Sequence, residues 1–122
     1  MRKLLFLVAG VAVAAVALAQ SPDADKWVAP PDAAKKANPL RNKPELAAGG
    51  KKIFEKSCAV CHQAGENQVG PHLNLPQTQS QSDGALFWKI TNGNSRTAMP
   101  SFSSLPDGQR WQLVLYIRSL KK

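Results

Sequence analysis

One stretch organises this chain: Cys58-Ala59-Val60-Cys61-His62. The spacing C-x-x-C-H is typical of c-type haem attachment, in which two thiols add to the two vinyl groups of a haem and form thioethers. Two intervening residues on one helical turn let both sulfurs face the same edge of the macrocycle. The histidine that follows can supply a neutral imidazole to the iron. The stretch therefore predicts one haem c, attached through Cys58 and Cys61 and ligated by His62.

An iron held by one imidazole has a second axial position, and the chain offers two side chains for it. Met99 is the only methionine besides Met1, and His72 is the only histidine besides His62. Met99 precedes Pro100 in an irregular segment, where a short loop can hang its side chain over the ring. We predict His/Met ligation, which raises the reduction potential and leaves no open coordination site. Ligation by His72 is the alternative.

The first residues are typical of an export signal. A basic start, Met1-Arg2-Lys3, precedes an apolar run over residues 4–19 that ends in Ala17-Leu18-Ala19. A small residue, any residue and a small residue are the usual cleavage site of a secretory signal peptide. The run is shorter than the roughly 20 residues of a membrane span. We predict a signal peptide over residues 1–19, cleavage near Ala19 and a periplasmic location, with membrane association only if the leader is uncleaved.

Residues 20–44 form the next segment, and they contain Pro22, Pro30, Pro31, Pro39 and Pro44. So many prolines favour an extended, irregular N-terminal extension. Trp27 is one of its few large apolar side chains. We expect Trp27 to hold the extension against the domain, with docking to a partner as the alternative.

The remaining sequence predicts about three helices, over residues 44–57, 83–92 and 107–120. Ser82 is a candidate N-cap and Gly93 a candidate stop for the second of these helices. Ser104 begins a pattern that resembles a capping box for the third. Residues 63–81 and 94–103 are expected to be loops. No pair of strands is apparent, so we predict an all-α fold.

The net charge of the chain limits the classes of partner that it can be expected to bind. The chain has a net charge of +8, which would suit nucleic acid, but an exported protein does not meet cytoplasmic nucleic acid. We expect instead that the charge steers redox protein partners with acidic docking surfaces, and we assign Lys51, Lys52 and Lys56 to the docking face. A thiol oxidoreductase that uses Cys58 and Cys61 remains an alternative, although no βαβ pattern surrounds the motif.

Several short motifs follow one another between Gly50 and Leu120. They are Gly50-x-x-x-Phe54, Cys58-x-x-Cys61-His62, Gly70-Pro71-x-Leu73, Met99-Pro100 and Leu113-x-x-Tyr116. Together they resemble class I c-type cytochromes, and the separation of His62 from Met99 is similar to that of the compact bacterial members. Two features depart from the family: Gln63 stands where glycine is frequent, and the proline-rich extension has no counterpart.

The resemblance implies a cytochrome c domain over residues 45–122, built around the haem. It implies that Gly50 and Phe54 on the first helix meet Leu113 and Tyr116 on the last. It also implies that the carbonyl of Pro71 faces the ring N–H of the proximal histidine, as part of the haem-binding site.

We therefore expect a periplasmic electron-transfer protein and not an enzyme. Three alternatives are a subunit docked to a larger periplasmic dehydrogenase, a haem enzyme or a gas binder with a labile sixth ligand. Trp88 and Arg96 are candidate hydrogen-bond donors to the haem propionates, although each suits ordinary packing or surface exposure equally well.

Overall fold

The computed structural model describes residues 27–63 and 69–122, and all regular structure in these ranges is helical. The helices are α1 (Pro31–Ala34), α2 (Ala47–Ser57), α3 (Ala59–His62), α4 (Pro76–Gln79), α5 (Asp83–Asn92) and α6 (Asp107–Ser119), with a 3-10 turn at Pro44–Leu46. The all-α prediction is confirmed, and the three long helices correspond to α2, α5 and α6. The signal peptide predicted over residues 1–19 lies outside the described residues. Within the described ranges, no helix combines the length and apolar character needed to cross a bilayer.

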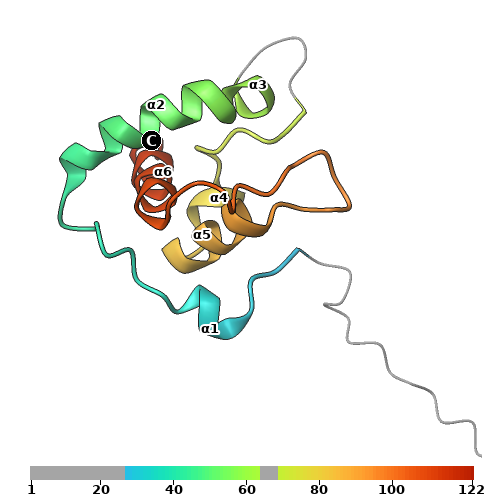
Figure 1. Cartoon of the computed structure of the whole chain (residues 1–122), viewed down its shortest axis with the longest axis horizontal. Coiled ribbons are helices and arrows are strands. Elements are labelled where there is room, and N and C mark those ends of the chain that lie inside the picture. Colours follow the sequence, from blue (N-terminus) through green and yellow to red (C-terminus); the bar gives the residue numbers. More distant parts are fainter. Residues whose placement is uncertain (1–26, 64–68) are drawn as a thin grey trace, which may run out of the picture.

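The crossing of α2 and α6 forms the centre of the domain (Figure 1). A Cβ atom on Gly50 would stand 2.5 Å from the carbonyl carbon of Gln112, so only glycine lets the two backbones approach this closely. Beside the crossing, the rings of Phe54 and Tyr116 lie 5.1 Å apart between centroids. Leu113 is completely buried there. The helix contact that the resemblance implied is confirmed.

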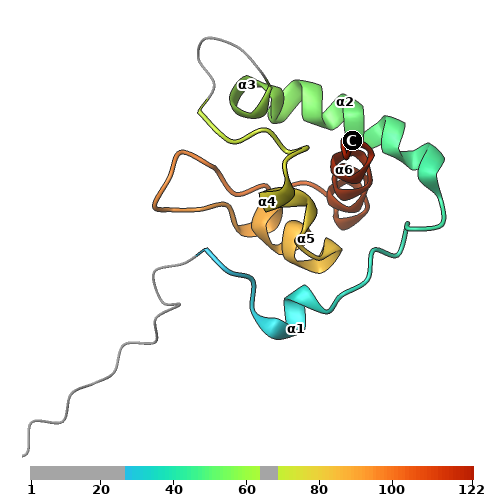
Figure 2. The same cartoon turned by 180° about the vertical axis from the view of Figure 1, so that it is seen from behind.

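The hydrophobic core extends from this crossing to α5. Its buried members are Phe54 of α2, Leu86 and Ile90 of α5, and Trp111, Leu113, Val114 and Ile117 of α6. α6 contributes most of them, which explains why its sequence is apolar on so many sides. Seen from the back, α6 lies between α2 and α5 (Figure 2). α6 is therefore the element against which the other long helices pack.

The ends of α5 follow the predicted signals. The hydroxyl of Ser82 accepts a hydrogen bond from the backbone N–H of Ala85 at 3.1 Å, as an N-cap does. Gly93 follows α5 with a φ of 62°, a conformation that favours glycine. The capping box predicted at Ser104 is wrong. α6 begins after Pro106 with no side-chain cap, and Asp107 pairs instead with Arg110 on the next turn.

Two of the segments predicted to be irregular, residues 20–44 and 63–81, each contain a short helix. In the N-terminal extension, α1 lies beside α5, and Ala29 and Asn38 are buried. The buried Asn38 side chain donates to the carbonyl of Trp111 at 3.2 Å, which ties the extension to α6. In the loop predicted over residues 63–81, α4 begins at Pro76, a residue well suited to a first helical turn. Both differences arise because contacts with the domain order segments too short to be helical alone.

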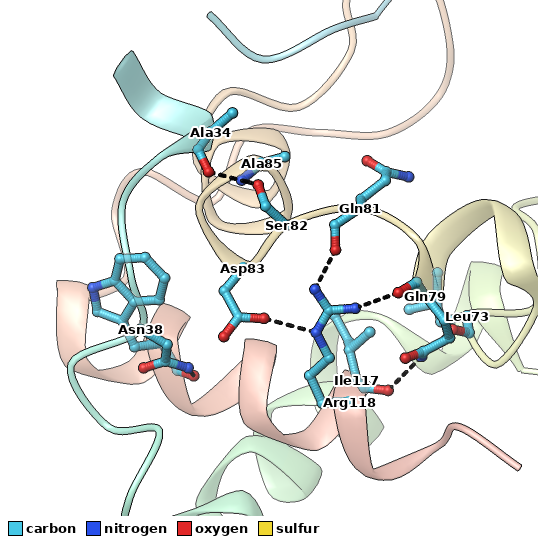
Figure 3. Close-up of polar contacts among 11 residues, drawn as sticks. Ala34, Asn38, Leu73, Gln79, Gln81, Ser82, Asp83, Ala85, Ile117 and Arg118 are labelled. Carbon is cyan, nitrogen blue, oxygen red and sulfur yellow. Dashed lines mark hydrogen bonds and ion pairs between the residues drawn. The ribbon is translucent and has the colours of Figure 1, made fainter. Parts of the chain in front are cut away.

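Arg118 of α6 joins α6 to α5 and to the chain around α4 (Figure 3). Its guanidinium donates to the carboxylate of Asp83 at 2.7 Å and to the carbonyl of Gln79 at 2.8 Å, and it also reaches the carbonyl of Gln81. The Gln79 side chain in turn donates to the carbonyl of Ile117 at 2.8 Å. This network supplies side-chain donors to the backbone carbonyls of Gln79, Gln81 and Ile117. Gln81 and Ile117 also line the cavity described next.

Candidate haem site

A cavity of about 440 Å³ lies between the helices, and the predicted site residues form part of its walls. Cys58, Cys61 and His62 line it from the end of α2 and from α3. Met99 lines it from the loop after α5, and Pro71 from the chain before α4. Much of the remaining wall is core: Phe54, Leu86, Ile90, Phe102, Leu113 and Ile117. A mostly apolar cavity with a few polar groups is the usual form of a cofactor site.

His62 is held by the residues before α4. Its ring atom Nδ1 lies 2.9 Å from the carbonyl oxygen of Pro71. Because a carbonyl can only accept, Nδ1 carries the proton and Nε2 keeps its lone pair, which is the form that binds a metal. The backbone N–H of Gly70 also donates to the carbonyl of Cys61 at 2.8 Å. The contact between Pro71 and His62 that the resemblance implied is present.

Gly70 has no room for a side chain, because a Cβ atom would stand 2.6 Å from Cε1 of the His62 ring. We expect Gly70→Ala to displace this ring, break its hydrogen bond to Pro71 and destabilise the protein by about 1–3 kcal/mol. Thermal unfolding followed by absorbance in the haem region measures the effect. Gly108→Ala is the matched control, since nothing lies within 4 Å of a Cβ atom there. Equal melting temperatures for the two variants would contradict the tight fit around His62.

The two cysteines are half-buried free thiols in the structure. Burial, with a smaller contribution from Cys61, raises the pKa of the Cys58 thiol to about 11. Catalytic cysteines have a lowered pKa, because the thiolate is the nucleophile. A thiol that is protonated at neutral pH does not suit thiol exchange. Its position at the cavity wall suits attachment to a group within the cavity.

Met99 belongs to a loop that closes on itself. The backbone N–H of Asn94 donates to the carbonyl of Met99 at 3.0 Å, and the Met99 side chain is half-buried at the cavity. His72, the alternative ligand, lies outside this cavity and lines a second hollow next to Lys51 and Tyr116. The cavity therefore brings His62 and Met99 together and leaves His72 apart.

Two residues that sequence reasoning did not assign also line the cavity, Trp27 and Lys89. Lys89 shares a helical face with Leu86 and Ile90, so the spacing i, i+3, i+4 could have predicted that Lys89 faces the interior. Nothing local marks Trp27, because its neighbours show no periodic pattern. Trp88 and Arg96, the predicted propionate donors, do not line the cavity.

Taken together, the helical fold, the cavity and the C-x-x-C-H segment in its wall define a small protein that encloses a covalently attached haem. The residues fit this group on three counts: two thiols at one wall, an imidazole whose Nε2 is free, and a largely apolar interior.

Comparisons with known proteins point to the same class. Residues 45–117 match the family model described as cytochrome c oxidase, cbb3-type, subunit III. Cytochrome c6 of Cyanidioschyzon merolae is 34% identical over 80 residues, which cover 62% of this chain and 75% of that protein. Cytochrome c6 of Leptolyngbya boryana is 34% identical over 77 residues, covering 58% of this chain and 88% of the relative. Cytochrome c6 of Rippkaea orientalis is 38% identical over 64 residues, and the chain spans only 56% of its length. No solved structure shows a significant match.

The chain therefore belongs to the c-type cytochromes, as a small monohaem member of class I. It carries one haem c, bound covalently through its two cysteines, Cys58 and Cys61.

Proposed function

We propose that this protein is a periplasmic one-electron carrier whose haem iron is ligated by His62 and Met99. Bound haem supplies an iron that gains and loses one electron. The observation that carries the proposal is that His62 and Met99 both line the one cavity to which the cysteines belong. Two permanent axial ligands leave no site for a substrate, so the protein transfers electrons without making or breaking a bond to another molecule.

Each group in the cavity has a definite task in this proposal. Pro71 holds the His62 ring through Nδ1, which keeps the iron-binding nitrogen unprotonated and fixed in direction. The self-closed loop after α5 limits the movement of Met99. The buried side chains of α5 and α6 exclude water from the cavity. A rigid, dry site keeps the change in structure small when the charge of the iron changes.

We further propose that residues 1–19 are a cleaved signal peptide, that residues 20–44 are an extension, and that residues 45–122 are the cytochrome domain. The basic start and apolar run support export. The family match begins at residue 45, which supports the boundary of the domain. Mass spectrometry of the periplasmic fraction tests export and cleavage, because removal of residues 1–19 and one attached haem give a defined mass.

Absorption spectroscopy tests the electron-carrier proposal directly. We expect a red protein whose ferric form shows the long-wavelength absorption band that the resemblance to His/Met cytochromes implies. We also expect that the ferrous form does not bind carbon monoxide. Rapid carbon monoxide binding with no such band would favour the alternative of a gas binder or haem enzyme. Stable co-purification with a larger dehydrogenase in low salt would favour a docked subunit.

We propose that partners with acidic surfaces approach the lysines of α2. Lys51, Lys52 and Lys56 are exposed, and α2 leads directly into the cysteine at the cavity wall. The ion pair of Lys51 with Glu55, at 3.9 Å between exposed side chains, is weak and leaves this surface basic. Charges near a docking site raise the association rate more than the affinity.

Exchanging these three lysines for glutamine is expected to slow electron transfer to the anion hexacyanoferrate(III) at low salt. The fall should be several-fold and should vanish at high salt, because ions screen exposed charges. Stopped-flow absorbance gives the rates. The same exchange at Lys35, Lys36 and Lys43 removes equal charge from the exposed N-terminal extension and serves as the control. Equal slowing in both triple variants would remove α2 as the docking face.

A further inference from the structure

The N-terminal extension lies along α5, antiparallel to it. At the start of α5, the hydroxyl of Ser82 donates to the carbonyl of Ala34 at 2.6 Å (Figure 3). The absence of a side chain on Gly84 permits this approach, since a Cβ atom would stand 2.7 Å from the carbonyl oxygen of Lys36. At the other end of α5, the extension reaches Gly93 through Trp27.

Trp27 makes two specific contacts at that end. Its indole Nε1 donates to the carbonyl of Gly93 at 2.9 Å. The ammonium of Lys89 lies 4.7 Å from the centroid of the indole ring, within the range of a cation–π interaction. Both side chains also line the haem cavity. Partial burial lowers the pKa of the Lys89 ammonium.

Gly93 lies at the start of the loop that carries Met99, where the two ends of this loop come together. It sits directly against Pro100, because a Cβ atom on Gly93 would stand 2.5 Å from the carbonyl carbon of that proline. The next residue, Asn94, closes the loop by its hydrogen bond to the carbonyl of Met99. A donor that holds the carbonyl of Gly93 therefore holds the point at which both ends of the loop meet.

We propose that Trp27 is a positioning residue that fixes the Met99 loop through the carbonyl of Gly93 and closes that edge of the haem cavity to water. This inference rests on the proposed ligation by Met99. The role of Trp27 differs from simple anchoring of the extension, because Asn38 and Ser82 already make the anchoring contacts further along the chain. Trp27 acts through the backbone and contributes no atom to the iron.

The test is the rate at which imidazole binds to the ferric holoprotein. An external ligand enters only when Met99 leaves, so the rate reports how often the loop opens. Trp27→Phe keeps an aromatic ring under Lys89 but removes the N–H donor. We expect imidazole binding to become about two- to tenfold faster, the change that losing one hydrogen bond produces. Trp27→Ala also removes the ring and should be faster still.

Two controls make the outcome decisive. Val28→Ala alters the exposed neighbour in the same segment and should leave the rate unchanged. Met99→Ala should bind imidazole fastest of all. If the Trp27 variants bind imidazole at the wild-type rate while Met99→Ala is fast, Trp27 is only an anchor and this inference fails alone. If Met99→Ala also binds at the wild-type rate, the proposed ligation itself fails. A lower melting temperature in Trp27→Ala with an unchanged rate would likewise overturn the positioning role.

Discussion

Met99→Ala is expected to convert a protein that excludes external ligands into one that binds carbon monoxide stoichiometrically in the ferrous state. Among the described residues that line the cavity, Met99 is the only methionine, and His72 lies outside the cavity. The described cavity lining therefore offers no second thioether or imidazole that could replace Met99 as the iron ligand. The reduction potential should fall, because a thioether favours the ferrous iron more than water does. Absorbance under carbon monoxide and a redox titration measure the two effects.

Ser95→Ala is the matched control for this variant. Ser95 belongs to the same loop and is exposed, and it does not line the cavity. We expect it to keep the wild-type potential and to remain inert to carbon monoxide. An unchanged potential in Met99→Ala would remove Met99 from the iron and would favour a five-coordinate haem enzyme or gas binder.

Gly50→Val is expected to have the largest effect on stability. Any Cβ atom on Gly50 meets the main chain of α6, at 2.5 Å from the carbonyl carbon of Gln112 and 3.0 Å from the backbone nitrogen of Leu113. Backbone atoms cannot rotate away, so α2 must shift from α6. Overpacking of this kind costs about 1–3 kcal/mol, and we expect the upper end, which lowers the melting temperature by on the order of 10 °C. Thermal unfolding followed by circular dichroism measures it.

The preceding glycine offers the comparison. A Cβ atom on Gly49 would meet only the side-chain carboxamide of Gln112, with its Cδ at 3.1 Å. That group ends a flexible side chain and can turn aside. Alanine also favours a helix over glycine by up to about 1 kcal/mol, so Gly49→Ala should melt at or above the wild-type temperature. If Gly49→Ala and Gly50→Ala were equally stable, close backbone contact at Gly50 would not be what holds α2 against α6.

The haem-attachment segment and the limits of α5 could be predicted because the residues that determine them are close together in the sequence. The haem-attachment segment is contiguous, and the limits of α5 follow from Ser82 and Gly93, each of which acts on its immediate neighbours. The cap of α6 was mispredicted for a related reason. Ser104 has the composition of a cap, but Pro106 already occupies the N-cap position, and Asp107 finds a partner in Arg110.

The sequence alone was sufficient for the covalent haem and the all-α class, since a contiguous motif and helical periodicity express them. The pairing of Gly50 with α6 was implied by the resemblance to class I cytochromes. The order of the N-terminal extension, and the places of Trp27 and Lys89 in the cavity wall, became visible only in the folded chain. Trp27 reaches a carbonyl 66 positions away. Such a contact depends on how α5 and the extension lie in space, and no pattern along the chain records that arrangement.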